Sequence, residues 1–205
     1  MDIQHDTMPA GRMGEQADQL GAEQVAVRLC QRGDPAGLAT LVAIHQARAV
    51  RLAALITHDP HLAEDVVAEA FLVAFRRCQR FDTRRPFAPW FHRVVATTAL
   101  KMLAARHREV SLDGREQMFE ADEPADLAQP DAAARLAALE DQAAIRAALT
   151  ALPAKQRAAV VLKYFAELDE AEIAAALAIP RGTVKSRVFN GLARLRLKLA
   201  ELRPT

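Results

Sequence analysis

The chain has 205 residues, 51% hydrophobic and 26% charged, which is enough apolar material for a core and excludes wholesale disorder. Alanine and leucine dominate, and β-branched residues do not alternate in strand-like runs, so we predict an all-α fold. Cys30 and Cys78 lie in helical patterns and are expected to be buried small hydrophobes rather than a disulfide. No apolar run approaches the roughly 18 residues of a membrane span, and the N-terminus lacks a signal-peptide pattern. We therefore expect a cytoplasmic protein without membrane insertion.

The net charge of +1 conceals a partition along the chain. Residues 22–108 hold 13 basic against 7 acidic side chains, and residues 131–205 hold 12 against 8. Residues 109–130 hold 1 basic against 7 acidic side chains, and residues 1–21 hold 1 against 4. Two basic blocks separated by an acidic segment indicate a polyanionic partner.

The chain order of helix signals and breakers predicts four parts. We expect a mobile N-terminal extension, a first helical domain, a linker with Gly, Pro and many acids, and a second helical domain. Their predicted ranges are 1–22, 23–108, 109–130 and 131–205. Within the first domain, we expect a helix break at Gly33-Asp34-Pro35, with Asp34 as the cap of the next helix. The helices that follow are expected at 35–56, 61–80 and 87–107. A turn at 57–60 and a loop at 81–86 would separate them.

The segment 169–199 is the most informative part of the second domain. Asp169 and Glu172 have the spacing of a capping box, which starts a helix. The sequence Ala-Ile-Pro-Arg-Gly at 178–182 then breaks that helix, and Thr183 is expected to cap the next one. Two helices joined by a tight turn, the second rich in Lys and Arg, are typical of a helix-turn-helix unit whose second helix enters a DNA groove.

The second helix of this unit has two chemically different faces. Its apolar side chains point one way at about 100° per residue: Val184, Val188, Leu192 and Leu195. Ser186 and Asn190 point the opposite way, flanked by basic side chains that suit phosphates and base edges. The alternative is an ordinary helical hairpin with a solvated basic face.

Further motifs precede this unit in a fixed order: Gly33-Asp34-Pro35-Ala36, then the stretch from Ala63 to Phe71, the stretch from Phe87 to Val95, and the stretch from Leu152 to Arg157. With Gly182-Thr183-Val184-Lys185-Ser186-Arg187, they make the chain resemble an extracytoplasmic-function sigma factor over about residues 23–203. Such proteins are small specificity subunits of bacterial RNA polymerase. The resemblance implies two domains, sigma region 2 and sigma region 4.

The resemblance implies three sets of site residues. Core polymerase would be bound on its clamp through Asp65, Ala68 and Glu69, although the family typically has Gln at the position of Ala68. The −10 element would be read and opened by Phe81, Arg84, Arg85, Trp90, Arg93, Thr97 and Lys101. The −35 element would be read by Arg181, Thr183, Lys185, Ser186, Arg187, Phe189, Asn190 and Arg194.

Besides Ala68, three of these positions depart from the family pattern. Thr97 stands where Asn is frequent, Lys101 where Asp or Asn is frequent, and Asn190 where Arg is frequent. Thr97 reads less of a base edge than Asn, and the loss of a cation at Asn190 should weaken the phosphate contribution to DNA binding. Trp90 has a second interpretation as a core anchor, and Asp65 and Glu69 one as a solvated face.

The resemblance also implies partners: the polymerase clamp and flap, double-stranded promoter DNA, the non-template single strand, and an anti-sigma factor. The free domains are expected to move relative to each other or to be held together by such a partner. No catalytic constellation, metal-ligand spacing or nucleotide-binding glycine pattern occurs, so we expect no enzyme activity, metal or cofactor. The alternatives are a stand-alone helix-turn-helix regulator and a sigma-like adaptor with weakened promoter opening. The sequence does not indicate the promoter, the inducing signal or the organism.

Overall fold

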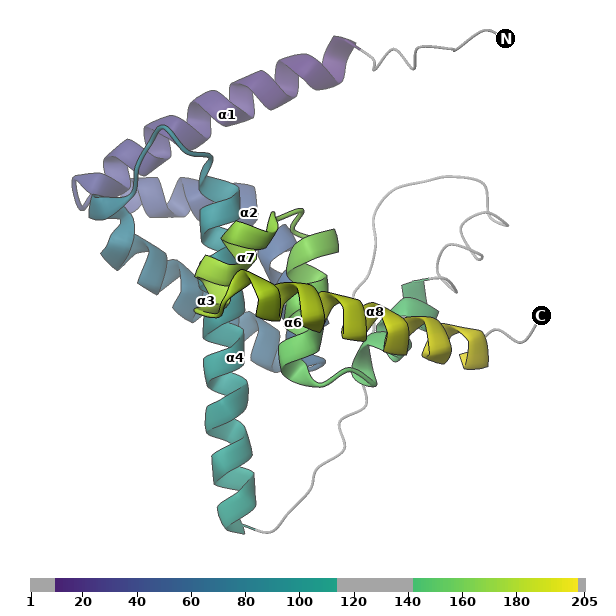
Figure 1. The fold of residues 1–205 in the computed structure, drawn as a ribbon. Coiled ribbons are helices and arrows are strands. Elements are labelled where there is room, and N and C mark those ends of the chain that lie inside the picture. Colours follow the sequence, from purple (N-terminus) through teal and green to yellow (C-terminus); the bar gives the residue numbers. More distant parts are fainter. Residues whose placement is uncertain (1–9, 114–141, 203–205) are drawn as a thin grey trace, which may run out of the picture.

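A computed structural model describes residues 10–113 and 142–202, and within these ranges every regular element is helical (Figure 1). The all-α prediction is therefore confirmed for the described residues. Residues 142–150 are also helical. The elements are α1 (Ala10–Gln31), α2 (Pro35–Thr57), α3 (Pro60–Arg77), the 3₁₀ turn η1 (Cys78–Arg80), α4 (Phe87–Asp113), α6 (Ala154–Tyr164), α7 (Glu170–Leu177) and α8 (Arg181–Leu202).

Asp-Pro pairs start two of the core helices. Asp34 accepts a hydrogen bond from the backbone N–H of Ala36 at 2.9 Å, and Asp59 accepts one from Leu62 at 3.0 Å. The following proline has no N–H to satisfy and its ring already favours the helical φ. Gly33 has φ of +80°, a left-handed conformation that favours glycine and lets the chain leave α1. The break predicted at 33–35 is confirmed.

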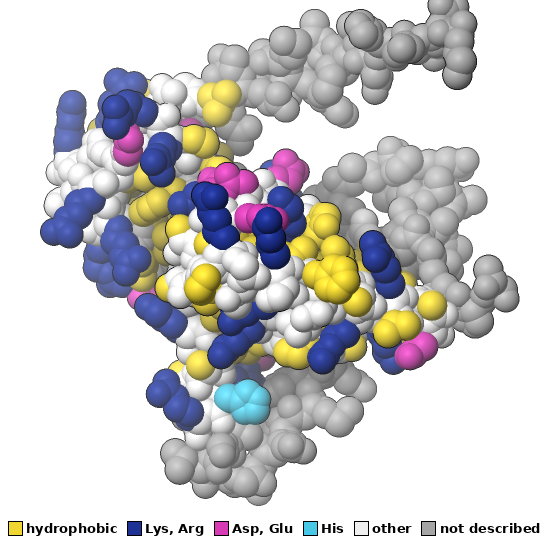
Figure 2. Space-filling model, in the orientation of Figure 1, with side chains coloured by type: hydrophobic (Ala, Val, Ile, Leu, Met, Phe, Trp, Pro, Cys, Tyr) yellow, Lys and Arg dark blue, Asp and Glu magenta, His cyan; other side chains and the backbone are white. Residues whose placement is uncertain are grey.

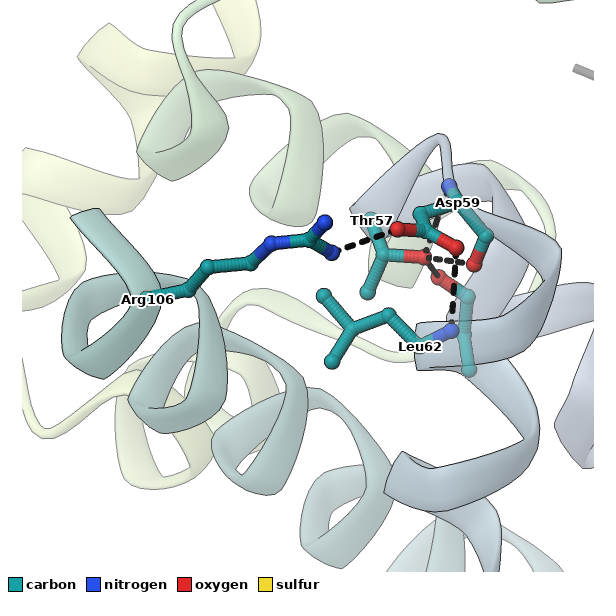
Figure 3. A network of polar contacts seen from close by, with 5 residues as sticks. Thr57, Asp59, Leu62 and Arg106 are labelled. Carbon is teal, nitrogen blue, oxygen red and sulfur yellow. Dashed lines mark hydrogen bonds and ion pairs between the residues drawn. The ribbon is translucent and has the colours of Figure 1, made fainter. Parts of the chain in front are cut away.

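A polar corner ties the start of α3 to α4 (Figure 3). The carboxylate of Asp59 also accepts a hydrogen bond from Arg106 of α4 at 2.5 Å, while the Thr57 hydroxyl lies 3.1 Å from the Asp59 carbonyl oxygen. Burial raises the pKa of Asp59, but the hydrogen bonds from Leu62 and Arg106 lower the pKa more, so the carboxyl stays ionised. This corner fixes the direction of α4, on which four of the predicted −10 residues lie.

Helix α2 is the centre of the first domain and contacts α1, α3, α4 and α6. Among the described residues, it is the one helix long and apolar enough to cross a membrane by length and composition, with a mean hydropathy of 1.3. This helix contains no uninterrupted apolar run of that length, because His45 and Arg48 lie within it; it qualifies only by the average hydropathy of a window. Leu52, Ala53 and Ile56 are fully buried in the protein core.

Three other expectations need correction. Helix α1 begins at Ala10, within the segment 1–22 that we expected to be mobile. Thr183 lies inside the first turn of α8 rather than capping it, and its N–H donates to the Pro180 carbonyl at 2.9 Å. Helix α4 continues to Asp113, so the first residues of the predicted linker are helical. Residues 1–9 and 114–141, with the rest of that linker, lie outside the described residues.

The two groups of helices pack directly on each other. Helix α2 contacts α6, and α4 contacts both α6 and α7, so the C-terminal helices lie across the face of α4 in Figure 1. One cluster of buried side chains runs through both groups, from Ala26 in α1 to Val184 in α8. We expected the domains to be mutually mobile or joined by a partner. In the structure, the chain's own residues join them.

Two histidines, the half-buried His58 and the buried His92, lie at this junction. His58 ends α2 in a left-handed conformation and faces Arg157 of α6, and His92 of α4 faces Arg48 and His45 of α2. Burial first, and then these neighbouring positive or ionisable groups, lower the pKa of both histidines to about 4. One ring nitrogen of each, Nε2 of His58 and Nδ1 of His92, is buried without a hydrogen-bond partner. Both rings are therefore held neutral in the folded chain.

The first prediction concerns the close approach of α1 and α2 at Gly37. A Cβ atom there would come within 2.7 Å of the backbone N of Cys30. Gly37→Ala should therefore lower the free energy of unfolding by about 1–3 kcal/mol through overpacking, as measured by urea denaturation. Gly21→Ala is the matched control, because nothing lies within 4 Å of the added atom. It should raise stability by about 0.5–1 kcal/mol, and equal effects of the two variants would contradict the packing.

The second prediction concerns acid stability. A histidine with a pKa near 6.5 in the unfolded chain and about 4 in the folded chain binds more protons when unfolded between these values. Stability is thus complete above pH 6.5 and is lost as the pH falls toward 4. Each histidine should cost about 1–2 kcal/mol between pH 7 and pH 5 in urea denaturation. His58→Asn, which tolerates the left-handed backbone, and His92→Gln should each reduce this loss; an unchanged pH profile would contradict the assignment.

Candidate nucleic-acid interface

Helices α7 and α8 form the predicted helix-turn-helix unit. The capping box is present: the Glu172 N–H donates to Asp169 Oδ1 at 2.7 Å, and the Asp169 N–H donates to Glu172 Oε2 at 3.0 Å. The helix ends at Ala178, which is left-handed with φ of +50°, and not at Gly182, which lies inside α8. Pro180 directly precedes α8, and its carbonyl accepts hydrogen bonds from the N–H groups of Thr183 and Val184 in the first turn. The turn therefore has the predicted place but a different left-handed residue.

Helix α8 is positioned by its contact with α6. Val184 is fully buried, and Val188, Leu192 and Leu195 pack against the core, as the sequence pattern predicts. At Gly191, an added Cβ would come within 2.7 Å of Val160 Cγ2, so α8 and α6 approach closely there. Sequence reasoning did not single out Gly191. Its role follows from helix packing, which one helix's own pattern does not reveal.

The opposite side of α8 is exposed and largely uncommitted. The eight residues predicted to read the −35 element all lie on this helix, with Thr183 and Arg187 half-buried and the others exposed. The Lys185 Nζ lies 3.7 Å from Glu170 of α7, and the Ser186 hydroxyl donates to the Thr183 carbonyl at 3.0 Å. Within the described chain, neither Arg187 nor Asn190 has a side-chain hydrogen bond or ion pair. Phe189 is 73% exposed. This face thus offers free cations and donors.

Figure 2 shows Lys and Arg side chains along α8 and also around the far end of the first helical group, on the same face of the molecule. The second basic area includes the loop between η1 and α4. Its residue Phe81 is buried and lies 4.9 Å from the Trp90 ring and 5.7 Å from the Phe87 ring. Phe81 and Trp90 therefore anchor the loop through an aromatic cluster, which agrees with the core interpretation of Trp90.

A shallow hollow lies between this loop and α1. Phe81 forms part of its wall, Thr83 and Arg85 come from the loop, and Glu23 and Gln24 come from α1. An apolar wall with nearby hydrogen-bonding groups is the composition that a flipped base needs. This open hollow has room for about 20 Å³, about one water molecule, so a base would enter only if the loop moved.

The two loop arginines differ in what they contact. Arg84 makes a bidentate pair with Asp82, with Nε–Oδ1 and Nη2–Oδ2 distances of 2.9 Å. These hydrogen bonds from Arg84 lower the pKa of Asp82 to about 2, so the pair is ionised throughout the ordinary pH range. Arg85 is exposed, and its side chain has no hydrogen bond or ion pair to any described residue. Arg85 is thus the less restrained cation.

The predicted −10 residues of α4 also differ in how far their side chains are already bound within the chain. Arg93 is bound to Glu172 of α7 with an Nη2–Oε1 distance of 2.6 Å. The Thr97 hydroxyl lies 2.9 Å from the backbone carbonyls of Arg93 and Val94, so it is occupied within its own helix. Lys101 is exposed. The structure therefore leaves Lys101 accessible and commits Arg93 to the other domain.

The predicted polymerase-binding residues lie on the outer face of α3. Asp65 and Ala68 are exposed, and Glu69 is half-buried and paired with Arg76 at 2.8 Å. Val66 and Ala70 on the opposite face are fully buried. Asp65 makes no hydrogen bond or ion pair within the described chain, so its carboxylate is available to a basic partner surface.

Two arginines that sequence reasoning did not place in a site join the domains. The buried Arg157 of α6 donates to the Ile56 carbonyl of α2 at 2.7 Å, and Arg48 of α2 donates to the Phe165 carbonyl at 3.1 Å. The partners are 101 and 117 residues apart along the chain. No local pattern connects residues so distant, although the motif containing Arg157 did mark that segment. In the described parts of the chain, no group of His, Cys, Asp or Glu could hold a metal ion.

Comparison with known proteins agrees with this arrangement of basic helices. The family models for sigma-70 region 2 and sigma-70 region 4 match residues 41–109 and 142–195. The chain is 31% identical over 181 residues to the ECF RNA polymerase sigma factor SigW of Bacillus subtilis, covering 86% of this chain and 96% of that protein. It is 32% identical over 174 residues to the RNA polymerase sigma-H factor of Pseudomonas aeruginosa, covering 82% and 89%.

Two solved structures share the fold. One is the sigma factor RpoE in complex with the anti-sigma factor NepR from Bartonella quintana, with a TM-score of 0.60 and 24% identity, covering 78% of this chain and 92% of that chain. The other is CnrH in complex with the cytosolic domain of CnrY, with a TM-score of 0.56 and 21% identity, covering 88% and 98%. On the family models and the two curated relatives, this chain belongs to the extracytoplasmic-function sigma factors of the sigma-70 family.

Proposed function

We propose that this sigma factor binds core RNA polymerase and directs it to promoters by reading a −35 element with α8 and a −10 element with loop 81–86 and α4. The observation that carries the proposal is the exposed face of α8. Lys185, Arg187 and Asn190 stand there on a helix whose other face is fixed to α6 and α7. A rigidly held helix with free cations and amides suits the major groove of DNA.

The proposed reading of the −10 element rests on the second basic area, which includes the loop between η1 and α4. Opening DNA requires that a base leave the stack and that the phosphates of the single strand be held. Arg85 and Lys101 are exposed cations, one in loop 81–86 and one on α4, and Phe81, Phe87 and Trp90 of the same two segments form an aromatic cluster. The hollow beside Phe81 is where we place the captured base. Bases stack on aromatic rings whatever their identity, so the cluster supplies affinity, and the polar groups of the hollow supply selectivity.

We further propose two protein partners for this cytoplasmic factor. The unpaired carboxylate of Asp65 on α3 suits a basic surface on the polymerase clamp. The two solved structures that share the fold are both complexes, and in one of them the partner is an anti-sigma factor. An inhibitory protein of that kind is therefore the expected second partner.

The most direct test of the function is run-off transcription with purified core polymerase and a library of random promoters. A sigma factor yields transcripts that share two spaced motifs upstream of their start. A stand-alone regulator binds DNA without core polymerase and yields no transcripts. The absence of any promoter-dependent product would overturn the proposal, and a positive result also delivers the recognised sequence.

The third prediction concerns the DNA-facing cations of α8. Lys185→Ala with Arg187→Ala should weaken promoter binding by the holoenzyme at least about tenfold, since one base or phosphate contact is worth about 1–3 kcal/mol. The salt dependence of binding should also fall, by about one unit of slope per lost phosphate contact. Binding to core polymerase should be unchanged, as measured by fluorescence anisotropy.

The matched control removes two cations from the far half of the same helix, Arg196→Ala with Lys198→Ala. Its net charge equals that of the test variant, so a loss caused only by charge would appear in both. Transcription that survives the Lys185 and Arg187 changes would contradict the groove assignment.

The fourth prediction separates the two loop arginines. Arg85→Ala should weaken holoenzyme binding to a −10 single strand more than Arg84→Ala, because Asp82 already neutralises Arg84. Asp82→Asn should release Arg84 and partly compensate for Arg85→Ala. Trp90 is the single tryptophan of the chain, and its ring contacts Phe81 of the loop. Its fluorescence therefore reports binding at the loop when polymerase without tryptophan is used. Equal losses for the two arginine variants would contradict the assigned difference.

A further inference from the structure

Helix α1 holds the first end of the loop between η1 and α4 (Figure 1). Glu23, Val27 and Gln31 are four residues apart, so they share one face of α1. The Gln31 Nε2 donates to the Phe81 carbonyl at 2.9 Å, which fixes the backbone of the residue whose ring forms part of the wall of the hollow. The family model for sigma-70 region 2 begins at residue 41, so α1 lies outside the matched part of the chain.

Glu23 holds the other end of the loop. Helix α4 begins at Phe87, and the N–H groups in the first turn of a helix lack intrahelical partners. The Phe87 N–H donates to Glu23 Oε1 at 3.4 Å, while Glu23 Oε2 lies 2.8 Å from the Nε2 of His45 on α2. A carboxylate is favoured at a helix N-terminus by the helix dipole. The Glu23 side chain, which is 12% exposed, therefore caps α4 from another helix.

The middle of the loop is less restrained than its two ends. Phe81 and Phe87 are buried and their rings pack on each other. Between them, the hydrogen bonds of residues 82–86 to described residues stay inside that segment and join Asp82 to its neighbours. A base enters the hollow only if the loop moves, and the anchored ends leave residues 82–86 to move. The captured base would then lie between this segment and the fixed surface of α1.

Gln24 is an uncommitted polar group that α1 presents to the hollow. It lines the hollow together with the buried Val27 and with Glu23. Glu23 is already engaged at both carboxylate oxygens, whereas the exposed Gln24 amide has no hydrogen bond to any described residue. A primary amide offers an acceptor and two donors, and it can form two hydrogen bonds with one base edge. Gln24 thus has the chemistry to distinguish one base from another.

We propose that α1 is the fixed wall of the hollow that captures a −10 base: Gln31 and Glu23 are positioning residues that hold the loop ends, and Gln24 selects the base. The inference deepens the proposed function and rests on it, because that function places the captured base in the hollow. Arg85 on the movable side holds phosphate whatever the sequence, whereas a contact with Gln24 depends on the base.

The test of selection is run-off transcription from the library of random promoters, with the full chain and core polymerase. With Gln24→Ala, one position of the −10 motif should lose about tenfold of its base preference, since a bidentate contact between an amide and a base is worth about that ratio. The other −10 positions and the −35 motif should keep their preferences. Gln24→Glu keeps the shape but replaces the amide donors by an acceptor, so it should change the order of the four bases at that same position.

The positioning role is measured separately with Gln31→Met. This variant removes the donor to Phe81 and keeps an unbranched, uncharged side chain. Holoenzyme affinity for a −10 single strand should fall about fivefold for all four bases alike, because the wall is misplaced whichever base is captured. Affinity for core polymerase and the −35 motif should not change. An unchanged strand affinity, or a loss shared by core binding, would overturn the positioning role.

The matched control is Gln46→Ala on α2, which makes the same chemical change at another exposed helical position. Gln46 does not line the hollow, and it has no hydrogen bond to any described residue. Both promoter motifs should equal those of the original chain. A loss of base preference equal to that of Gln24→Ala would show a general effect and would overturn the selecting role.

The transcription results separate this inference from the function on which it rests. An original chain without promoter-dependent transcripts would overturn the proposed function and the inference together. A normal −10 motif that Gln24→Ala and Gln24→Glu both leave unchanged would overturn the inference and leave the function standing.

Discussion

The buried guanidinium of Arg157 is the constraint on which the arrangement of the two domains depends. Taking this cation out of water is costly, and burial lowers its pKa to about 10. The cost is offset by two carbonyls, one from Leu152 in its own domain and one from Ile56 in the other. If the domains part, the Ile56 carbonyl needs water in place of Arg157.

Internal pairing divides the basic side chains into two classes. Arg84 is paired with Asp82, and Arg93 with Glu172, so either must give up a carboxylate before it binds a phosphate. Arg85 and Arg187 have no such partner in the described chain. Under the proposed function, the unpaired cations would make the first contacts with DNA. The paired ones exchange one anion for another, which contributes less affinity but makes binding depend on the conformation of the chain.

Much of the fold could be predicted from the sequence because its signals are local. Asp34 and the Asp169–Glu172 capping box start helices through hydrogen bonds two or three residues away, and Gly33 ends one through its own backbone. The exposed and buried faces of α8 follow from helical periodicity in the same way. Local signals failed at Thr183, a good cap that lies inside the helix because the Pro180 carbonyl already accepts the first hydrogen bonds of α8.

The set of candidate site residues stays a prediction, and the structure adds the contacts that those residues make within the chain. The positions came from motif order, and their availability came from partners far along the chain. Arg93 has the position of a good phosphate ligand, but Glu172, 79 residues away, binds it in the folded chain. Phe81 and Trp90 likewise proved to pack on each other.

The central claim is that α8 reads one promoter element and that the loop beside α1 captures a base of the other. The most direct measurement is site-specific cross-linking from photoreactive bases in promoter DNA to the original sequence bound to core polymerase, under conditions that yield transcripts. The account predicts cross-links from the −35 element to α8, and from one −10 base to α1 and residues 81–86. Cross-links from the −10 element that miss both α1 and this loop would contradict it.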